Sequence, residues 1–164
     1  MKKIGLVSDT HNFLDEKIFE HFAGCDEIWH AGDFGSMELA ERLKDKKILK
    51  GVYGNIDGAD IRSVYPETLR FTCEDVTVMM THIGGYPPKY NASVLKQLKA
   101  DPPRLFICGH SHILKIIFDP AINCLHINPG AAGRSGWHTM RTVIRFQING
   151  TVINNCEVIE LGKR

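Results

Sequence analysis

Two histidines stand two positions apart at the end of an apolar run in this sequence. The run is "RLFIC", residues 104–108, and the histidines are His110 and His112, separated by Ser111. On an extended backbone, residues two apart project to the same side, so both imidazoles are expected to face one target while Ser111 turns away. A metal ion is one such target, because imidazole nitrogens are common metal ligands. The alternative is a polar turn after a buried strand, and this pair alone does not decide between the two.

Four further apolar runs are also followed by residues that can bind a metal. Because they are rich in Ile, Val, Leu and Met and bounded by Gly and polar residues, they suit strands buried on both faces. They are "KIGLV" (3–7), "EIWHA" (27–31), "ILKGVY" (48–53) and "VTVMMT" (76–81). In an α/β sheet the carboxyl ends of the strands line one crevice, where ligands bind. Seven side chains are therefore expected to converge there: Asp9, His11, Asp33, Asn55, His82, His110 and His112.

Each of these residues also has a structural explanation when it is taken alone. Asp and Asn are common in turns and helix caps, and a single histidine is more often structural than a ligand. Caps, however, have no reason to recur at every successive strand end with oxygen and imidazole donors together. Glycines precede Asp33, Asn55 and His110, which favours close backbone approach at these points.

The number of these side chains exceeds what one tetrahedral site can use. Seven mixed nitrogen and oxygen ligands suit a pair of adjacent ions that share one carboxylate. Ions about 3.5 to 4 Å apart can each bind a phosphoryl oxygen and can hold a bridging hydroxide for in-line attack. The hypothesis is therefore that His110 and His112 point at two different metals.

The rest of the chain suggests how these residues are positioned. Three segments place apolar residues on one helical face: 14–24, 36–46 (capped at Ser36) and 91–101. Strands that alternate with helices imply a layered sheet with crossover connections. After Ile113 successive strands predict an antiparallel meander, at 113–118, 123–127, 142–148 and 152–161, with a tight turn at Asn149 and Gly150. We expect a single domain over residues 1–164.

Composition narrows the class of partner. The formal charge of +1 creates no global field that would favour long nucleic acids or an anionic membrane. Five scattered cysteines without a C-x-x-C pair indicate reduced thiols. The first apolar run stops at Asp9, and no segment approaches the length of a membrane span. We therefore expect a cytoplasmic protein without membrane association.

Five short blocks, in order, resemble the calcineurin-like metallophosphoesterases, specifically their small bacterial and archaeal phosphodiesterase branch. The family blocks D-x-H, G-D, G-N, H and G-H-x-H appear as "SDTHN", "HAGDFG", "YGNID", "THIGG" and "CGHSH", over residues 8–112. One block alone is weak, but five in order with suitable spacing are highly specific. The later "INPGAAGRSG" resembles the N-P-G loop of this branch. The resemblance implies an α/β fold, a four-layer αββα sandwich of two mixed β-sheets flanked by helices.

The resemblance also implies a role for each of the seven side chains. The first metal would be held by Asp9, His11 and His112. The second would be held by Asn55, His82 and His110. Asp33 would bridge the two metals, and a metal-bridging hydroxide would attack phosphorus, with Asp33, Asn55 and His82 catalytic through this hydroxide and through substrate positioning. We expect two divalent ions, manganese first, with iron, nickel, cobalt or zinc as alternatives that such ligands accept.

One departure from the family pattern affects the leaving group. Many larger members read G-N-H-[DE], and their histidine is the proposed acid, whereas this chain has Ile56 in "GNID". An isoleucine cannot donate a proton, so help for the leaving group must come from elsewhere or be absent. Asp57 follows, but strand alternation would turn it away from Ile56.

Three further residues have structural and functional interpretations. His30 is expected to be a buried, hydrogen-bonded histidine, with orientation of a metal ligand as the alternative. Asn128 could orient a ligand loop. Arg134 is a candidate for binding a substrate phosphate, because a guanidinium matches phosphate oxygens, with solvated surface as the alternative.

The leading prediction is a two-metal phosphodiesterase that acts on a small phosphate ester. A phosphomonoesterase or a nuclease could use the same metals, although near-neutral charge disfavours long nucleic acids. A different class is a non-catalytic adaptor, since a retromer subunit shares this fold but departs from the ligand pattern at the bridging position. A metal-binding regulator without turnover is a third class. The β-rich C-terminal half also offers strand edges that could pair in a homo-oligomer.

Overall fold

The computed structural model describes residues 1–164, with four helices and twelve strands. The helices are α1 (Lys17–His21), α2 (Met37–Lys44), α3 (Ala59–Val64) and α4 (Ala92–Ala100). The first strands are β1 (Lys2–Val7), β2 (Glu27–His30), β3 (Ile48–Gly51), β4 (Thr68–Cys73), β5 (Val76–Thr81), β6 (Gly85–Tyr86) and β7 (Lys89–Tyr90). The later strands are β8 (Leu105–Ile107), β9 (Leu114–Asp119), β10 (Cys124–Pro129), β11 (Met140–Asn149) and β12 (Val152–Lys163).

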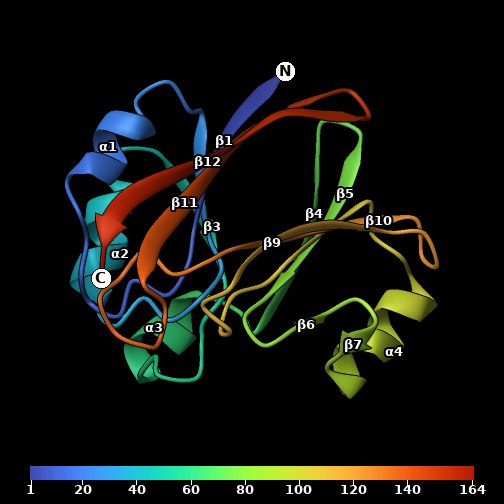
Figure 1. Cartoon of the computed structure of the whole chain (residues 1–164), viewed down its shortest axis with the longest axis horizontal. Helices are drawn as coiled ribbons and strands as arrows, with labels where there is room; N and C mark the ends of the chain where they lie inside the picture. Colours follow the sequence, from blue (N-terminus) through green and yellow to red (C-terminus); the bar gives the residue numbers. More distant parts are fainter.

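Two five-stranded mixed sheets form the centre of the molecule (Figure 1). The first has the order β12-β11-β1-β2-β3, in which β1, β2 and β3 are parallel and β11 is antiparallel to β1. The second has the order β4-β5-β8-β10-β9, in which β5, β8 and β10 are parallel. The parallel strands bring their carboxyl ends to one side of each sheet, as the sequence predicted.

Four layers follow from the side chains on the two faces of each sheet. In β1, Leu6 faces the second sheet, while Val7 packs under α1 and α2, because successive strand residues point to opposite faces. In β8, Ile107 faces the first sheet and Phe106 packs against α4. Helices α1, α2 and α3 lie outside the first sheet and α4 outside the second (Figure 1). The predicted αββα sandwich is therefore confirmed.

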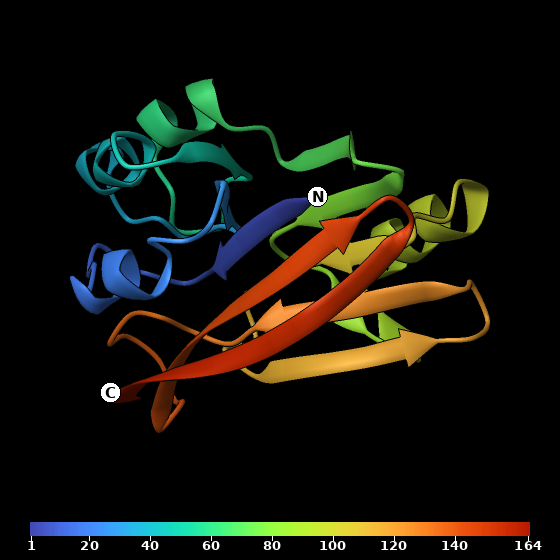
Figure 2. The same cartoon turned by 90° about the horizontal axis from the view of Figure 1, so that it is seen from above.

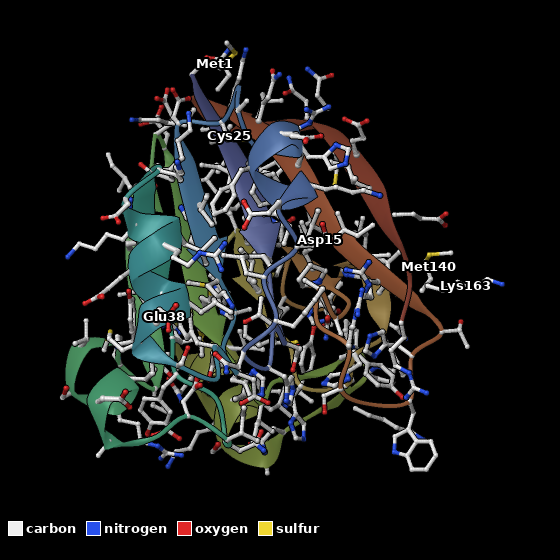
Figure 3. The ribbon with its side chains drawn as sticks, turned by 90° about the vertical axis from the view of Figure 1, so that its left-hand side faces the viewer. Met1, Asp15, Cys25, Glu38, Met140 and Lys163 are labelled. Carbon is white, nitrogen blue, oxygen red and sulfur yellow. The ribbon has the colours of Figure 1, made fainter.

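The helices agree with the predictions in part. Ser36 caps α2 as expected, because its Oγ accepts a hydrogen bond from the N–H of Leu39. The first helix, predicted over 14–24, forms only at Lys17–His21. The preceding residues form a loop in which Asp15 pairs with Arg141 of β11 at 2.8 Å. Figure 3 shows Asp15 in this loop and the ends of β11 and β12 meeting at Met140 and Lys163.

The prediction of one antiparallel meander after Ile113 was wrong. The hairpin β9–β10 joins the second sheet, where β10 also pairs in parallel with β8. The hairpin β11–β12, closed at Asn149 and Gly150 as predicted, joins the first sheet through β1. Figure 2 shows the two hairpins, in orange and red, diverging into different sheets. Apolar periodicity identifies strands but not their partners, so this split was hidden in the sequence.

Several elements were not predicted, namely α3, β4, β6 and β7. These are short or mostly exposed, so they lack a strong apolar pattern. No helix has the length and apolar character needed to cross a membrane.

Candidate metal centre

The seven predicted side chains lie together in loops that follow β1, β2, β3, β5 and β8. The site therefore lies where the carboxyl ends of both sheets meet. The structure brings all of them within a continuous set of contacts: Asp9, His11, Asp33, Asn55, His82, His110 and His112.

Five of the seven residues adopt left-handed backbone conformations. Their φ angles are 53° at Asp9, 46° at His11, 57° at Asp33, 67° at His110 and 59° at His112. Such conformations are uncommon for residues with a side chain and cluster at functional sites, where the surrounding structure holds them. The backbone thus turns sharply at most of the candidate ligands.

This finding corrects the expected geometry of the histidine pair. His110 and His112 lie in a loop after β8 rather than on an extended strand, so strand alternation does not orient them. The loop nevertheless directs them to different neighbours. His112 Nε2 lies 3.1 Å from Asp9 Oδ1, whereas His110 Nδ1 lies 2.9 Å from Asn55 Oδ1.

Two groups of side chains have the spacing of a metal site. In the first, one ligand atom each from Asp9, His11 and His112 lies within 4.8 Å of the others. In the second, the same holds for Asp9, Asp33 and His82. Asp9 belongs to both groups, and Asp33 of the second group also contacts the first, because its Oδ2 is 3.3 Å from His11 Nε2 and 3.2 Å from His82 Nε2.

Asn55 extends the second group. Its Oδ1 lies 3.1 Å from His82 Nε2 and 2.9 Å from His110 Nδ1. An amide oxygen and two imidazoles therefore share one small region beside Asp33. This is a mixed oxygen and nitrogen donor set of the kind that divalent transition metals accept.

Two buried atoms at the centre lack hydrogen-bond partners. These atoms are Asp9 Oδ1 and His11 Nε2. The other carboxylate oxygen of Asp9 accepts from Ser8 Oγ at 2.6 Å and from the N–H of His110 at 3.1 Å. Because buried polar atoms normally have partners, two unpaired atoms in a cluster of ligand-type side chains fit a bound cation.

The carboxylates and histidines shift each other's pKa values. Burial would raise the pKa of Asp9, but the adjacent imidazoles of His11 and His112 outweigh it and hold this pKa well below the usual range. Burial would also raise the pKa of Asp33, but the imidazoles of His11 and His82 outweigh this effect and lower the pKa. The nearby carboxylates of Asp33 and Asp9 raise the pKa of His11 to about 9. Without metal, the anionic carboxylates thus retain protons on histidine that a cation must displace.

His82 presents its Nε2 atom to the centre. Its Nδ1 lies 2.7 Å from the carbonyl oxygen of Ala31 and therefore carries the proton of that hydrogen bond. In a neutral imidazole the other nitrogen then has a free lone pair, so Nε2 is suited to bind a metal.

Close backbone approach explains two of the glycines that precede ligands. A Cβ on Gly54 would lie 2.0 Å from Asp33 Oδ1, and one on Gly109 would lie 2.1 Å from Ser8 Oγ. Neither position has room for a side chain, as the sequence suggested.

Asp57 has a structural role that sequence reasoning missed. Its buried carboxylate accepts hydrogen bonds from the N–H groups of Gly54, Phe34 and Gly35, at 2.8, 3.2 and 2.9 Å. It thereby ties the loop of Asn55 to the loop that follows Asp33. An acidic residue two positions after Asn55 was the only signal, and it resembles an ordinary turn residue.

The predictions for His30 and Asn128 agree with the geometry. His30 is fully buried and bonded to Thr10 Oγ1 at 3.0 Å, and burial lowers its pKa to about 3. Asn128 donates to the carbonyl of Gly109 at 2.9 Å and to Ser111 Oγ at 3.1 Å. It therefore holds the loop that carries His110 and His112.

Arg134 is exposed, and its guanidinium lies over the ring of Phe13, 4.3 Å from the centroid. No hydrogen bond or ion pair links it to the seven side chains. Its loop is nevertheless anchored at the centre, because the N–H of Gly133 donates to the carbonyl of Asp9 at 3.0 Å.

Comparison with known proteins identifies the family of this chain. Residues 1–151 match the calcineurin-like phosphoesterase superfamily domain. The chain belongs to this family. It is therefore a metallophosphoesterase-family protein, and the family uses divalent metals.

Individual relatives agree with this assignment. A probable metallophosphoesterase of Methanocaldococcus jannaschii is 29% identical over 134 residues, which cover 78% of this chain and 67% of that protein. A solved archaeal phosphodiesterase superposes with a TM-score of 0.76 and 25% identity, over 97% of this chain and 99% of that one. Vps29 of Entamoeba histolytica in complex with Zn²⁺ has the same fold, with a TM-score of 0.75 and 15% identity, over 96% and 98% of the two chains.

Proposed function

We propose that this protein is a phosphodiesterase that hydrolyses small phosphate esters with two divalent cations. The cations are held by the seven side chains described above, with Asp33 shared between them. The observation that carries the proposal is the pair of buried, unpartnered atoms, Asp9 Oδ1 and His11 Nε2, inside a cluster of carboxylates and imidazoles.

The protein's own residues supply the arrangement for this reaction. Two divalent cations bound there would polarise the phosphoryl oxygens and activate water for attack on phosphorus. Asp33 keeps its carboxylate between His11 and His82, and Asn55 offers an amide oxygen to the second site and an amide N–H to a substrate oxygen. Ser8 and the N–H of His110 fix the orientation of Asp9. Catalysis is thus assigned to Asp33, Asn55 and His82.

Arg134 is proposed to bind a substrate phosphate after rotating away from Phe13. A guanidinium can contact two phosphate oxygens at once. For the cations, we propose manganese, with iron, nickel, cobalt and zinc as candidates to compare, since a mixed imidazole and carboxylate set accepts all of them.

The proposal is tested by the initial rate of bis(p-nitrophenyl) phosphate hydrolysis as Mn²⁺ is added to metal-stripped protein. Wild-type protein is expected to gain activity with Mn²⁺, and Asp33→Asn is expected to remove it. Asp45→Asn, at the exposed end of α2, is the matched control and should retain the activity. Absence of turnover in folded, metal-loaded wild-type protein would refute the proposal.

Three alternatives remain, and the same assay with other substrates distinguishes them. The fold shared with Vps29 fits an adaptor that binds partners without turnover. The presence of Asp33 at the bridging position favours an enzyme over that alternative. Hydrolysis of p-nitrophenyl phosphate in preference to the diester would instead indicate a phosphomonoesterase, and cleavage of oligonucleotides a nuclease.

A further inference from the structure

A cavity of about 470 Å³ opens beside the candidate metal centre. It lies between the first turns of α4, the adjoining ends of β4 and β5, and Tyr53, which follows β3. Figure 1 shows α4 on the outer side of the second sheet, next to β6 and β7. We call this cavity the α4 pocket, and the residues that matter here are Tyr53, Glu67, His82, Asn91 and Gln97.

His82 connects the α4 pocket to the candidate metal centre. Its ring lines the pocket, while its Nε2 atom lies 3.2 Å from Asp33 Oδ2. A phosphate bound at the centre would therefore have one ester arm within reach of the pocket. The volume is sufficient for a small polar alcohol.

The walls of the α4 pocket are polar and carry little charge. Glu67 is the only carboxylate, and no lysine or arginine lines the cavity. The side chains of Glu67, Gln97 and Tyr53 make no hydrogen bond within the protein, so their polar groups remain available to a ligand. Asn91 differs, because its Oδ1 accepts from the N–H and the hydroxyl of Ser93.

We infer that the α4 pocket binds the alcohol part of the substrate, and that this alcohol is uncharged and carries several hydroxyl groups. Hydroxyls can donate to Glu67 and exchange hydrogen bonds with Gln97 and Tyr53. A second anionic group would face Glu67, while the nearest guanidiniums are already engaged, Arg62 on the ring of Tyr53 and Arg70 on the carbonyl of Gln97, so it would be disfavoured. This inference rests on the proposed function, because it assigns the phosphate to the metal centre.

A matched pair of phosphate esters tests this inference by calorimetry on Mn²⁺-loaded protein. Glycerol 3-phosphate and 3-phosphoglycerate have similar size, but only the second carries a carboxylate next to its hydroxyl. We expect the first to bind about tenfold more tightly, as one like-charge contact at moderate dielectric would cause. Glu67→Gln should reduce this ratio to near one by improving the binding of 3-phosphoglycerate.

A control variant separates the effect of Glu67 from a general change in surface charge. Glu74→Gln, an exposed position in the turn between β4 and β5, should leave the ratio unchanged. Equal affinities in wild-type protein, or a ratio that Glu67→Gln does not alter, would overturn the inference. The calorimetry does not depend on the diester assay. If the wild-type protein binds glycerol 3-phosphate selectively but does not hydrolyse the diester, the proposed function is rejected and the selectivity of the pocket is retained.

A separate surface carries a second inference. Strand β9 forms one edge of the second sheet, and its side chains are unusually apolar and exposed. The exposed fractions are 38% at Leu114, 41% at Ile116, 39% at Ile117 and 54% at Phe118. An edge strand with free backbone groups and exposed apolar side chains is a template for pairing with another strand.

We also propose that β9 pairs antiparallel with β9 of a second copy of this chain. With Ile117 at the centre of the pairing, Lys115 lies opposite Asp119 of the other copy, and Ile116 lies opposite Phe118. This register sets the exposed Ile116 against the exposed Phe118 of the other copy and buries both, so the strand fits its own copy. The two second sheets would then form one continuous sheet.

Sedimentation velocity over a wide range of protein concentration tests this pairing. Wild-type protein is expected to be a dimer, and Ile117→Lys is expected to be a monomer because it places like charges across the pairing. Val158→Lys is the matched control, since Val158 is also 39% exposed and lies on β12, the edge of the first sheet. A wild-type monomer at all concentrations, or a dimer that Ile117→Lys does not dissociate, would overturn the proposal.

Discussion

The Nδ1 atom of His82 lies 2.7 Å from the carbonyl oxygen of Ala31, and this hydrogen bond joins the two sheets at the candidate metal centre. His82 follows β5 of the second sheet, whereas Ala31 follows β2 of the first. The N–H of Ala31 in turn donates to the carbonyl of Val7 in β1 at 2.9 Å. The centre is thus built at a fixed junction, and its geometry depends on contacts between elements that are distant in sequence.

Asp57→Ala is expected to destabilise the protein and to remove phosphodiesterase activity. The substitution leaves the N–H groups of Gly54, Phe34 and Gly35 without their acceptor. Three unsatisfied donors, of which those of Phe34 and Gly54 are buried, should cost about 3 kcal/mol. For a chain of this size the midpoint of thermal unfolding should fall by roughly 6 to 12 °C.

Thermal unfolding of metal-free protein measures the loss of stability, and the diester assay measures the loss of activity. Asp57→Asn retains one acceptor oxygen and should give an intermediate loss of stability. Asp45→Ala, at the exposed end of α2, serves as the control. If Asp57→Ala unfolds at the wild-type temperature and keeps full activity, then Asp57 does not hold the two loops together.

The rate of diester hydrolysis is expected to depend steeply on the acidity of the leaving group. The side chain of Ile56 is exposed and carries no proton, while its N–H donates to Asp33 Oδ1 at 3.1 Å. A leaving alkoxide therefore receives no proton from this position, so good leaving groups should react much faster. A series of methyl aryl phosphates with phenols of increasing pKa measures this dependence through kcat/KM.

Ile56→His should make this dependence shallower by supplying an acid, and Ile56→Leu should leave it unchanged. A flat dependence in the wild-type protein would mean that another group protonates the leaving oxygen.

Stability is expected to fall below neutral pH because His126 is buried in its neutral form. Burial lowers the pKa of His126 to about 4, and the side chain packs against the ring of Phe106. Its pKa in the unfolded chain is the ordinary value of about 6.5. The unfolded state therefore binds more protons than the folded state as pH falls. The stability gained from burying neutral His126 is complete above the unfolded pKa and is lost as pH falls toward the folded pKa.

At pH 5 the expected loss from this group is ~2 kcal/mol relative to neutral pH. Urea unfolding of metal-free protein at both pH values measures the loss. His126→Phe should reduce it, since a phenyl ring suits the apolar site and does not titrate. His21→Gln, on the partly exposed helix α1, is the control. An identical pH dependence in His126→Phe and wild-type protein would show that other groups cause the loss.

The residues that gather at the candidate site were more predictable than their geometry. Asp9, Asp33 and His82 were identified because each follows an apolar strand, and strand ends of a layered α/β sheet meet at one edge. The left-handed backbone at His110 and His112 was not predicted, because their φ angles depend on contacts of the loop with Asp9 and Asn128.

The features of the fold that the sequence did not predict have the same origin. Apolar alternation located β9, β10, β11 and β12, but it did not reveal that the two hairpins join different sheets. Asp57 was also missed, because its three hydrogen bonds connect loops that only the folded chain brings together. Long-range pairing and buried polar contacts thus carry information that a local pattern does not contain.

The number of Mn²⁺ ions bound per chain tests the central claim most directly. Equilibrium dialysis of metal-stripped protein, followed by metal analysis, should give two ions per wild-type chain. Asp33→Asn should bind one or none, because it removes the carboxylate between His11 and His82, while Asp45→Asn should bind two. A wild-type protein that binds no Mn²⁺, or a stoichiometry that Asp33→Asn leaves unchanged, would contradict a two-metal centre built on Asp33.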